Sequence, residues 1–579
     1  MAGTRAAPRS RDATSLKIRD QAHYERLIMK KQLHRRDLPE VPRFHRDLLK
    51  HPLKEQFLEA ERLHLQSHKD MNSWNEVNVN ALTGRPQILD CMWVYTYKYD
   101  KHGRLDKCKA RLVVRGDQES RNGQDTYAAT LAGRSFRTLM AMAARFDLEL
   151  IQFDAVNAFV NAKLEDDVFM RMPPGHRKHG TVLKLNKALY GLRKSPLLWH
   201  RELTSTLIKM GFKPVPHEPC CLTLDGIVVF FYVDDIVFAY RKNHDVRAQA
   251  LEAQLRSKYR LTGGNALQWF IGIEILRDRE KGLIWLSQAS YIDKITRLIK
   301  HRGRDHSPMA SEELTPFEGI ASHADINRYQ VRTGSILYAA VITRPDVAFV
   351  ASKLAKFNSN PGLAHERAAD RALSYLARTR GLALRLGGGD DFEVASDASF
   401  ADDSTDRKSS QAFAMKLFDG LIGWRAGKQD TVTTSTTEAE LLALSQAAKE
   451  SLYVSRLIKE LDVVLDRGCI SIQCDNRQTI RLVTAEVATL QTKLRHIDVH
   501  NHWLRQEVAN NTLGVTYTPT AEIMADGLTK ALQGSMFRTF VERMGLEDIT
   551  DRLAARELPE TTDSMLQEQI YEAWEEQEV

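Results

Sequence analysis

Two adjacent aspartates, Asp234 and Asp235, lie within a stretch of the chain that is otherwise apolar. Residues 226–233 before the pair and Ile236 to Phe238 after it are rich in β-branched and aromatic side chains, which predicts two strands joined by a tight turn. Two carboxylates about 4 Å apart repel each other by about 4 kcal/mol near a protein surface. A bound divalent cation relieves that repulsion, so the pair indicates a metal site. For a bare Asp-Asp pair, an ordinary hairpin turn is the alternative.

Asp154 is a third candidate carboxylate, 80 residues before Asp234 in the chain. It closes the run 150–153, which we predict to be a strand that presents the aspartate at its end. Phosphoryl transfer by two metal ions needs carboxylates from separate elements that converge on ions roughly 3.5–4 Å apart. Asp154, Asp234 and Asp235 supply such a set, although Asp154 taken alone is more often a strand-end or helix-capping residue.

A second set of four carboxylates follows the triple glycine at 387–389. Asp397 and Asp475 end predicted strands, Glu440 lies in a predicted helix, and Asp526 precedes a glycine. Four acids on strand ends and helices suit a second two-metal site, at which water is the nucleophile. Each acid by itself is more often a cap or a solvated side chain, so only the ordered set favours a functional interpretation.

Composition limits the class of protein. With 579 residues, the chain should form about three or four domains. The apolar run 226–233 is too short to span a bilayer, so we expect no membrane segment. Six cysteines without a Cys-x-x-Cys pair argue against a disulfide framework or a zinc finger. We therefore expect an intracellular, unsecreted protein, and its net charge of +7 is compatible with nucleic acid.

The periodicity of the chain predicts mixed helices and strands. A helix is expected over 52–66, a basic hairpin from strands 91–99 and 109–116, and a helix over 134–146. The predicted organisation has six parts: a basic flexible segment (1–44), a first folded region (45–300), a linker (301–328), a helical segment (329–389), a second folded region (390–545) and an acidic tail (546–579).

Several sequence words resemble the reverse transcriptases of Ty1/copia-type retrotransposons. The segment Asp154-Ala-Val-Asn-Ala-Phe-Val-Asn-Ala162 is similar to a palm motif of that family. The segment Lys187-Ala-Leu-Tyr-Gly-Leu-Arg-Lys-Ser-Pro-Leu-Leu-Trp199 is similar to the next motif. The words around Asp397, Glu440, Asp475 and Asp526 resemble the RNase H domain that follows such enzymes. The matches run in order from about residue 45 to about residue 545, and the ordered set is highly specific.

The resemblance implies an α+β fold: a right-hand polymerase with fingers, palm and thumb, connection helices, and then an α/β RNase H-like domain. It implies two Mg²⁺ ions for each active site, with Mn²⁺ as a substitute. It also implies that the chain is encoded by the 3′ part of a longer Pol polyprotein gene. The implied partners are an RNA template, a DNA or tRNA-type primer, dNTPs and the RNA/DNA hybrid. The implied compartment is a cytoplasmic virus-like particle or the nucleus.

The family also implies roles for residues that bind the substrate. Phe159 matches the aromatic residue under the sugar of the incoming nucleotide, where a ring leaves no room for a 2′-hydroxyl. Lys109 and Arg111 match the fingers pair that contacts phosphate, and Arg111 is the better candidate because its guanidinium is a planar fork. Tyr232 is expected near the primer end. Without the family, these residues could belong to a core and to a solvated edge strand.

The chain departs from the family pattern at several places. Lys194 stands where an amide often contacts the nucleotide, Phe400 replaces a common tryptophan, and Asp402-Asp403 replaces a turn that contains glycine. Glu438 competes with Glu440 for the helical position, and the Glu-Leu-Leu-Ala spacing favours Glu440. The three histidines of one segment (His496, His500 and His502) are interpreted as structural. A decayed or domesticated fragment that only binds nucleic acid or proteins is the rival hypothesis.

Overall fold

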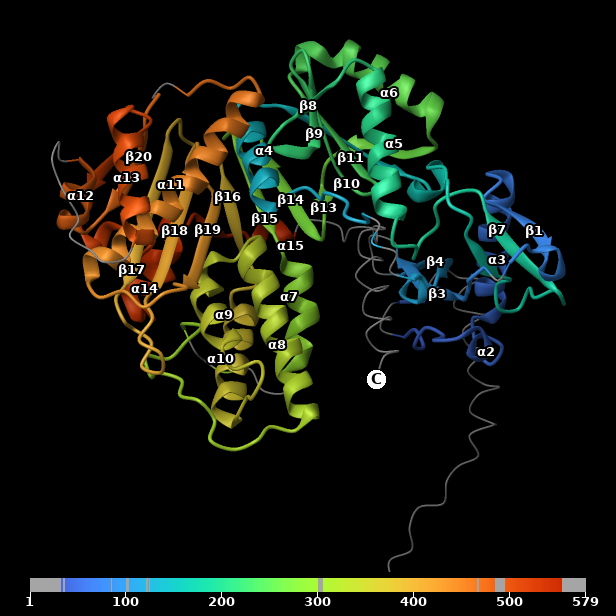
Figure 1. Cartoon of the computed structure of the whole chain (residues 1–579), viewed down its shortest axis with the longest axis horizontal. Helices are drawn as coiled ribbons and strands as arrows, with labels where there is room; N and C mark the ends of the chain where they lie inside the picture. The colour runs from blue at the N-terminus through green and yellow to red at the C-terminus, as the bar shows by residue number, and fades with distance from the viewer. Residues whose placement is uncertain are drawn as a thin grey trace, which may run out of the picture.

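The computed structural model of the chain mixes helices with five β-sheets among its described residues (Figure 1). The structure describes residues 33–34, 37–84, 86–99, 104–120, 123, 125–299, 303, 306–465, 468–484 and 495–554. The predicted basic segment 1–44 lies largely outside them, and so do residues 100–103 between the two predicted strands of the basic hairpin. Among the described helices, none is long and apolar enough to cross a bilayer.

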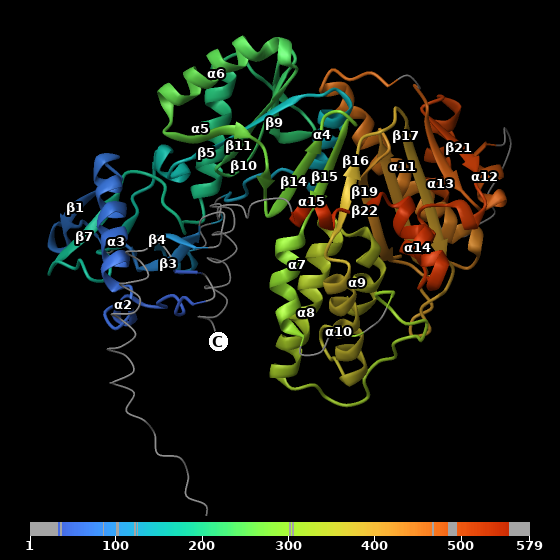
Figure 2. The ribbon, with the colours of Figure 1, turned by 180° about the vertical axis from the view of Figure 1, so that it is seen from behind.

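The N-terminal part is a small lobe, blue to teal in Figures 1 and 2, that packs around its own hydrophobic core. Its helix α3 covers the hairpin of β3 and β4, which is the predicted basic hairpin with a longer second strand. Its other sheet has the order β1-β7-β6-β2. The elements of the lobe are α2 (His45–Leu48), α3 (Lys54–Asp70), β1 (Trp74–Asn78), β2 (Ile88–Leu89), β3 (Cys91–Tyr99), β4 (Leu105–Val114), β6 (Phe169–Arg171) and β7 (Thr181–Leu185).

A six-stranded sheet with the order β12-β5-β11-β10-β9-β8 carries the first acidic set. Its central strands β10 and β11 are almost entirely buried, as their apolar composition predicts. The strands are β5 (Glu149–Ala155), β8 (Lys213–Val215), β9 (Glu218–Leu224), β10 (Ile227–Tyr232), β11 (Asp235–Tyr240) and β12 (Leu261–Ala266). The associated helices are α4 (Gly133–Arg145), α5 (Ser195–Lys209) and α6 (Asp245–Lys258).

A third sheet joins parts of the chain that are far apart in sequence, in the order β13-β14-β15-β16-β22. Below it in Figure 1 stands a cluster of helices from both sides of the predicted linker. The strands are β13 (Trp269–Phe270), β14 (Ile273–Asp278), β15 (Leu283–Ser287), β16 (Leu382–Leu386) and β22 (Leu546–Asp548). The helices are α7 (Ala289–Ile295), α8 (His323–Ile342), α9 (Ala348–Ala355) and α10 (Leu363–Arg378).

Apart from the two-stranded hairpin of β3 and β4, the fourth sheet is mixed and has the order β19-β18-β17-β20-β21. Its first three strands are antiparallel, whereas β20 and β21 run parallel to β17, and the long helix α11 packs on it. The strands are β17 (Phe392–Ser399), β18 (Ser410–Leu417), β19 (Gly420–Lys428), β20 (Ile470–Cys474) and β21 (Leu513–Tyr517). The helices are α11 (Thr436–Glu460), α12 (Arg477–Thr484), α13 (Arg495–Ala509) and α14 (Gly534–Arg543).

Two predicted boundaries are wrong in their details. The predicted acidic tail from 546 begins with β22, which pairs with β16, and continues into α15 (Thr550–Ala554). The predicted linker 301–328 overlaps α8, and its earlier part is held in place, because the Ser307 hydroxyl donates to Gln533 Oε1 at 2.7 Å. Local sequence patterns do not encode such long-range pairing, which is why both boundaries were misplaced.

Candidate active sites

The turn between β10 and β11 carries the Asp-Asp pair. Tyr232 pairs with Asp235, so the two residues of the turn are Val233 and Asp234. Val233 has a φ of 54°, a conformation that is strained for a β-branched residue. The indole Nε1 of Trp199 donates to the Val233 carbonyl at 2.6 Å. A strained turn held from outside by a buried tryptophan keeps Asp234 in a defined position.

Asp154 lies beside this turn, because β5 and β11 are antiparallel and place Asp154 directly opposite Asp235. Directly opposed residues have Cβ atoms about 4.5–5.5 Å apart and side chains on the same face of the sheet. Gln152 Nε2 donates to Asp235 Oδ1 at 2.9 Å, and the amide of Ala155 donates to the Asp234 carbonyl at 2.9 Å. The register therefore brings together the three carboxylates that the sequence singled out.

Both aspartates of the turn are almost completely buried: Asp234 is 1% exposed and Asp235 is 4% exposed. Asp154 is half-buried, and its Oδ2 accepts from Thr262 Oγ1 at 3.3 Å. Clustered buried carboxylates are costly unless a cation neutralises them. The donor set is all oxygen, which suits Mg²⁺ or Mn²⁺.

A cavity of about 590 Å³ adjoins the turn and includes Tyr232 and Val233 in its lining. Phe159 and Tyr190 form part of its wall and pack edge to face, with ring centroids 4.5 Å apart. The volume is typical of a site for a small ligand. Phe159 and Tyr232 thus line one cavity beside the turn, and their predicted places at the nucleotide sugar and the primer end stay predictions.

Arg111 does not line this cavity. It lies on β4, is 2% exposed, and its guanidinium lies over the ring of Tyr190 at 4.0 Å. Lys109 is half-buried on the same strand. Arg111 therefore lies behind Tyr190 at this cavity wall, and its predicted phosphate contact stays a prediction.

Lys194 lies in the neighbouring cavity, of about 630 Å³, where it forms an ion pair with Asp166. Arg193, which the sequence analysis did not single out, lines both cavities. Its Nε donates to the Gly116 carbonyl at 2.8 Å, which fixes the side chain between them. The cationic side chain at the border of the Phe159 cavity is that of Arg193. The sequence Arg193-Lys194 alone does not reveal which of the two adjacent cations lines that cavity.

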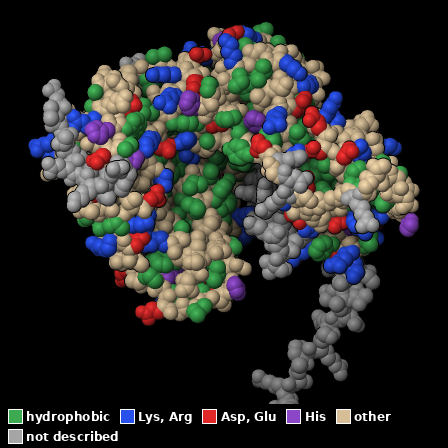
Figure 3. Space-filling view, in the orientation of Figure 1, with side chains coloured by type: hydrophobic (Ala, Val, Ile, Leu, Met, Phe, Trp, Pro, Cys, Tyr) green, Lys and Arg blue, Asp and Glu red, His purple; other side chains and the backbone are tan. Residues whose placement is uncertain are grey.

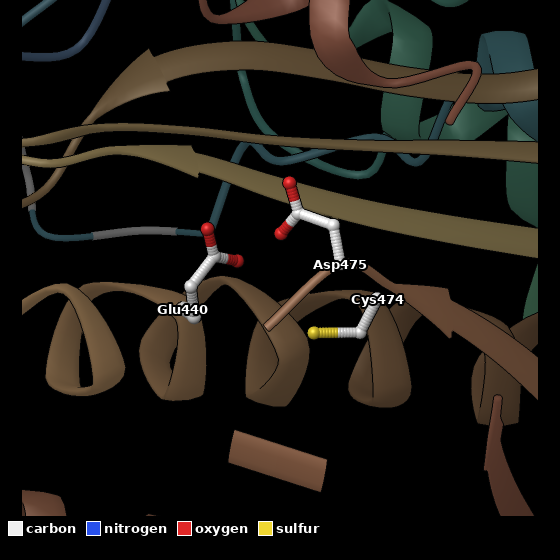
Figure 4. Close-up of side chains that lie close together, drawn as sticks. All are labelled: Glu440, Cys474 and Asp475. Atoms are coloured by element: carbon white, nitrogen blue, oxygen red, sulfur yellow. The ribbon is translucent and has the colours of Figure 1, made fainter. Parts of the chain in front are cut away.

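The second acidic set meets at one edge of the mixed sheet. Asp397 lies on β17, Asp475 follows β20, and these parallel neighbours bring both side chains to the same region. Glu440 on α11 and Asp475 offer ligand atoms within 4.8 Å of each other, together with Cys474. Figure 4 shows the two carboxylates pointing away from α11 and the thiol lying against it. Burial raises the pKa of Cys474 to about 12, so its protonated thiol is a poor metal ligand.

Burial disfavours the charged forms of two of these acids. It raises the pKa of Asp397 to about 6, and burial together with Asp397 and Asp475 raises the pKa of Glu440 to about 9. Asp397 Oδ1 and Glu440 Oε2 are buried without a hydrogen-bond partner among the described residues. Buried carboxylate oxygens without donors fit a divalent cation, which supplies the missing positive charge.

Asp526 completes the set, and two neighbours that the sequence analysis missed accompany it. Lys530 forms an ion pair with Asp526 and lies 3.8 Å from Asp397 Oδ2. The Thr529 hydroxyl donates to Asp397 Oδ2. The only signal in the sequence was their spacing, three and four residues after Asp526, which places side chains on the same side of a helical turn.

The structure distinguishes Glu438 from Glu440. Glu438 accepts from the amide and hydroxyl of Thr434 at 2.7 and 2.8 Å, at the start of α11. It therefore closes the helix N-terminus, whereas Glu440, two residues further along and on the opposite side of the helix, faces the other acids.

The three histidines that the sequence analysis interpreted as structural lie on or near α13. His500 Nδ1 lies 2.7 Å from Ser445 Oγ on α11, His502 is exposed, and the side chain of His496 lies outside the described part.

The loop that departs from the family pattern includes Phe400, which is 39% exposed. Asp403 is 1% exposed, and although burial opposes it, hydrogen bonds from two lysines (Lys356 and Lys428) lower its pKa. Lys353 pairs with Asp402 at 2.6 Å, so cations hold this loop.

Comparisons with known proteins identify relatives of this chain. Residues 73–305 match the family model described as reverse transcriptase (RNA-dependent DNA polymerase). The chain is 31% identical over 521 residues to the retrovirus-related Pol polyprotein from transposon TNT 1-94 of Nicotiana tabacum, covering 86% of this chain and 38% of that protein. It is 32% identical over 474 residues to the Pol polyprotein from transposon RE1 of Arabidopsis thaliana, covering 79% of this chain and 32% of that protein.

More distant relatives include the transposon Ty1-JR2 Gag-Pol polyprotein of Saccharomyces cerevisiae, with 24% identity over 519 residues, covering 85% of this chain and 29% of that protein. A foamy viral protease-reverse transcriptase, solved in complex with double-stranded DNA, is 12% identical with a TM-score of 0.45, and the match covers 79% of this chain and 69% of that one. The chain spans about a third of the length of the curated relatives it matches. It therefore carries a reverse transcriptase-family domain at residues 73–305 and is related over most of its length to the Pol polyproteins of Ty1/copia-type transposons.

Proposed function

We propose that the chain is an RNA-directed DNA polymerase that also cleaves the RNA strand of RNA/DNA hybrids. The observation that carries the proposal is the β5–β11 register, which sets Asp154 opposite Asp235 beside the Asp234 turn. A second, separate cluster of four acids accounts for the second activity.

The polymerase site is assigned to the sheet of β5, β10 and β11, which corresponds to a palm. The N-terminal lobe then corresponds to the fingers, the helices below the third sheet to a thumb and connection, and the mixed sheet to an RNase H-like domain. Hydrophobic side chains gather in the hollow between the lobes in Figure 3. Template and primer bind along this hollow, and Lys and Arg contacts with phosphate make that binding sensitive to salt.

In the polymerase site, Asp154, Asp234 and Asp235 would hold two Mg²⁺ ions, which supply positive charge for the triphosphate and activate the primer hydroxyl. Phe159 and Tyr190 would form the cavity wall beside the nucleotide sugar. Arg193, at the border of the same cavity, would neutralise part of the charge of the nucleotide phosphates. The primer 3′-oxygen attacks the α-phosphorus of a dNTP, and pyrophosphate leaves. The buried turn holds the carboxylates rigid, so little reorganisation accompanies the reaction.

In the second site, Asp397, Glu440, Asp475 and Asp526 would hold the metal ions for hydrolysis of RNA. Lys530 lies beside Asp526 and Asp397 and keeps part of the negative charge balanced before the substrate binds. Water attacks the scissile phosphorus, and the 3′-oxygen of the RNA leaves.

Paired variants test the two assignments independently. Asp234→Asn should lower primer extension on an RNA template by on the order of 100-fold or more and leave cleavage of a preformed hybrid unchanged. Asp397→Asn should give the reverse pattern, so each variant is the control for the other. A wild-type chain that extends no primer with Mg²⁺ or Mn²⁺ would identify a decayed element that only binds nucleic acid or proteins.

A further inference from the structure

Helix α4 lies between the two catalytic sheets. On one side, Phe136 stacks on Phe270 with ring centroids 5.0 Å apart and meets the edge of Phe230 at 6.4 Å. Phe230 belongs to β10, two residues before Tyr232 and the catalytic turn. On its other side, α4 presents two arginines, Arg134 and Arg137, to the C-terminal part of the chain. One helix thus touches both the polymerase sheet and the unit that carries the second acidic set.

Arg137 ties α4 to two further elements. It is 6% exposed, and its guanidinium donates to the Ile422 carbonyl of β19 at 2.7 Å and to the Val341 and Ile342 carbonyls at the end of α8 at 3.0 and 2.9 Å. It lies 4.1 Å over the ring of Trp424. Burial lowers the pKa of Arg137 to about 9, because it disfavours the charged guanidinium. The hydrogen bonds to three carbonyls offset part of that desolvation cost.

Arg134 reaches α11. It forms an ion pair with Glu450 and lies 3.8 Å over the ring of Tyr453. The Tyr453 hydroxyl donates in turn to the His217 carbonyl at 2.9 Å, between β8 and β9. The amide of His217 donates to Glu460 Oε2 at 3.1 Å. The second half of α11 is therefore clamped on the polymerase side at three of its residues.

The first half of α11 carries Glu440, ten residues before Glu450 and about 15 Å away along a rigid helix. A continuous packed path thus runs from the Asp234 turn through β10, Phe136 and α4 to Glu450, and along α11 to Glu440. Close-packed protein interiors have low compressibility and transmit strain.

We infer that the contact of α4 with α11 sets the distance between the two catalytic sites, with Arg134, Glu450 and Tyr453 as positioning residues. One nucleic acid then meets both sites in fixed register, and RNA is cut at a set distance behind the primer terminus. The functional half of this inference rests on the proposed function.

The docking itself is tested without any catalytic readout. Spin labels at Val246 on α6 and Met536 on α14, which are 84% and 63% exposed, report one distance. It is the distance between the part of the chain that carries the polymerase sheet and the C-terminal part that carries the second acidic set. The two half-buried cysteines, Cys91 and Cys469, are changed to serine in all proteins. A narrow distance distribution is expected for the full chain, a broad one for Arg134→Glu and for Glu450→Arg, and a narrow one again when both are combined.

Arg247→Glu is the matched control, because Arg247 pairs with Asp225 within one unit at 2.7 Å. It should keep the narrow distribution. Either a narrow distribution in both single reversals, or a failure of the charge swap to restore it, overturns the docking inference.

The register is tested by mapping RNA cuts during extension from an annealed primer. The full chain and the charge swap should cut within one narrow set of distances from the primer terminus. The single reversals should spread the cuts over many positions, with the rate of primer extension changed less than about twofold. Cuts that stay in register while the label distance broadens overturn the inference, whereas a full chain inactive in both assays with narrow label distances contradicts the proposed function alone.

Discussion

At the scale of single residues, the chemistry depends on where each side chain lies relative to a cavity wall. Phe159, Tyr190 and Tyr232 form one side of the cavity beside the turn. Arg111, equally prominent in the sequence, lies behind Tyr190 instead. Residue type and motif singled out Phe159, Tyr232 and Arg111 alike, and only the tertiary packing shows which of them line this cavity and which lies behind its wall.

Phe159→Val should relax sugar selection. Loss of the ring makes room for a 2′-hydroxyl, so the preference for dNTP over rNTP should fall by roughly 10- to 100-fold, measured as the ratio of kcat/KM values for extension. Phe212→Val is the matched control, because Phe212 is also buried, at 2% exposed against 5% for Phe159, and does not line the cavity. If both variants shift the ratio equally, Phe159 has no specific role.

The acids of the second site should make the stability of the metal-free chain fall with rising pH. Folding raises the pKa of Glu440 from about 4.5 to about 9, so the folded chain keeps a proton that the unfolded chain releases. Between these values, the free energy of unfolding should decrease by up to about 1.4 kcal/mol per pH unit.

Thermal unfolding in EDTA from pH 5 to pH 8 measures this slope. Glu440→Gln removes the titrating group and should flatten it, and Mg²⁺ should also flatten it by replacing the proton. A slope that persists unchanged in Glu440→Gln would assign the effect to other groups.

At the scale of elements, the hairpin of β10 and β11 was the part most readily predicted from sequence. Its apolar flanks and its turn follow from composition, and the pairing of Asp154 with Asp235 follows once β5 is placed beside β11. The left-handed conformation of Val233 was not predictable, because β-branched residues rarely adopt it. Such strain indicates a constraint imposed from outside, here by Trp199.

Val233→Gly should separate stability from activity. Relief of the strained φ, about 1–3 kcal/mol, is offset in part by the greater freedom of glycine in the unfolded chain, about 0.5–1 kcal/mol. We expect a free energy of unfolding that is unchanged or modestly higher in urea titrations. Primer extension should fall, because Asp234 is no longer held, whereas hybrid cleavage should not change. Extension at the wild-type rate would show that the strain has no catalytic role.

At the scale of the whole molecule, the division of the chain into successive domains describes the sequence better than the structure. The predicted regions 45–300, 329–389 and 546–579 each contribute a strand or more to the third sheet. Local patterns of hydrophobicity identified most of these elements but not their partners, because strand pairing over more than 150 residues leaves no local signal. The grouping of the carboxylates was predictable, since each acid lies in or next to an element that its own segment specifies.

Leu546→Asp should therefore destabilise the whole chain and not only its C-terminus. Leu546 is 6% exposed and pairs with the fully buried Leu384, so a carboxylate there would be buried. The expected loss is about 2–4 kcal/mol in the free energy of unfolding. Glu547→Gln keeps the acceptor for Trp285 Nε1 and should cost less than about 1 kcal/mol. Equal effects would show that β22 is dispensable.

The late arrival of β22 has a consequence for synthesis. Strand β16 is made about 160 residues before β22, so a growing chain leaves the ribosome with β16 as an open sheet edge until the mixed sheet has also been made. Open edges recruit strands from other chains. Premature termination anywhere between the two strands therefore leaves a product prone to aggregation, because β16 keeps an unpaired edge.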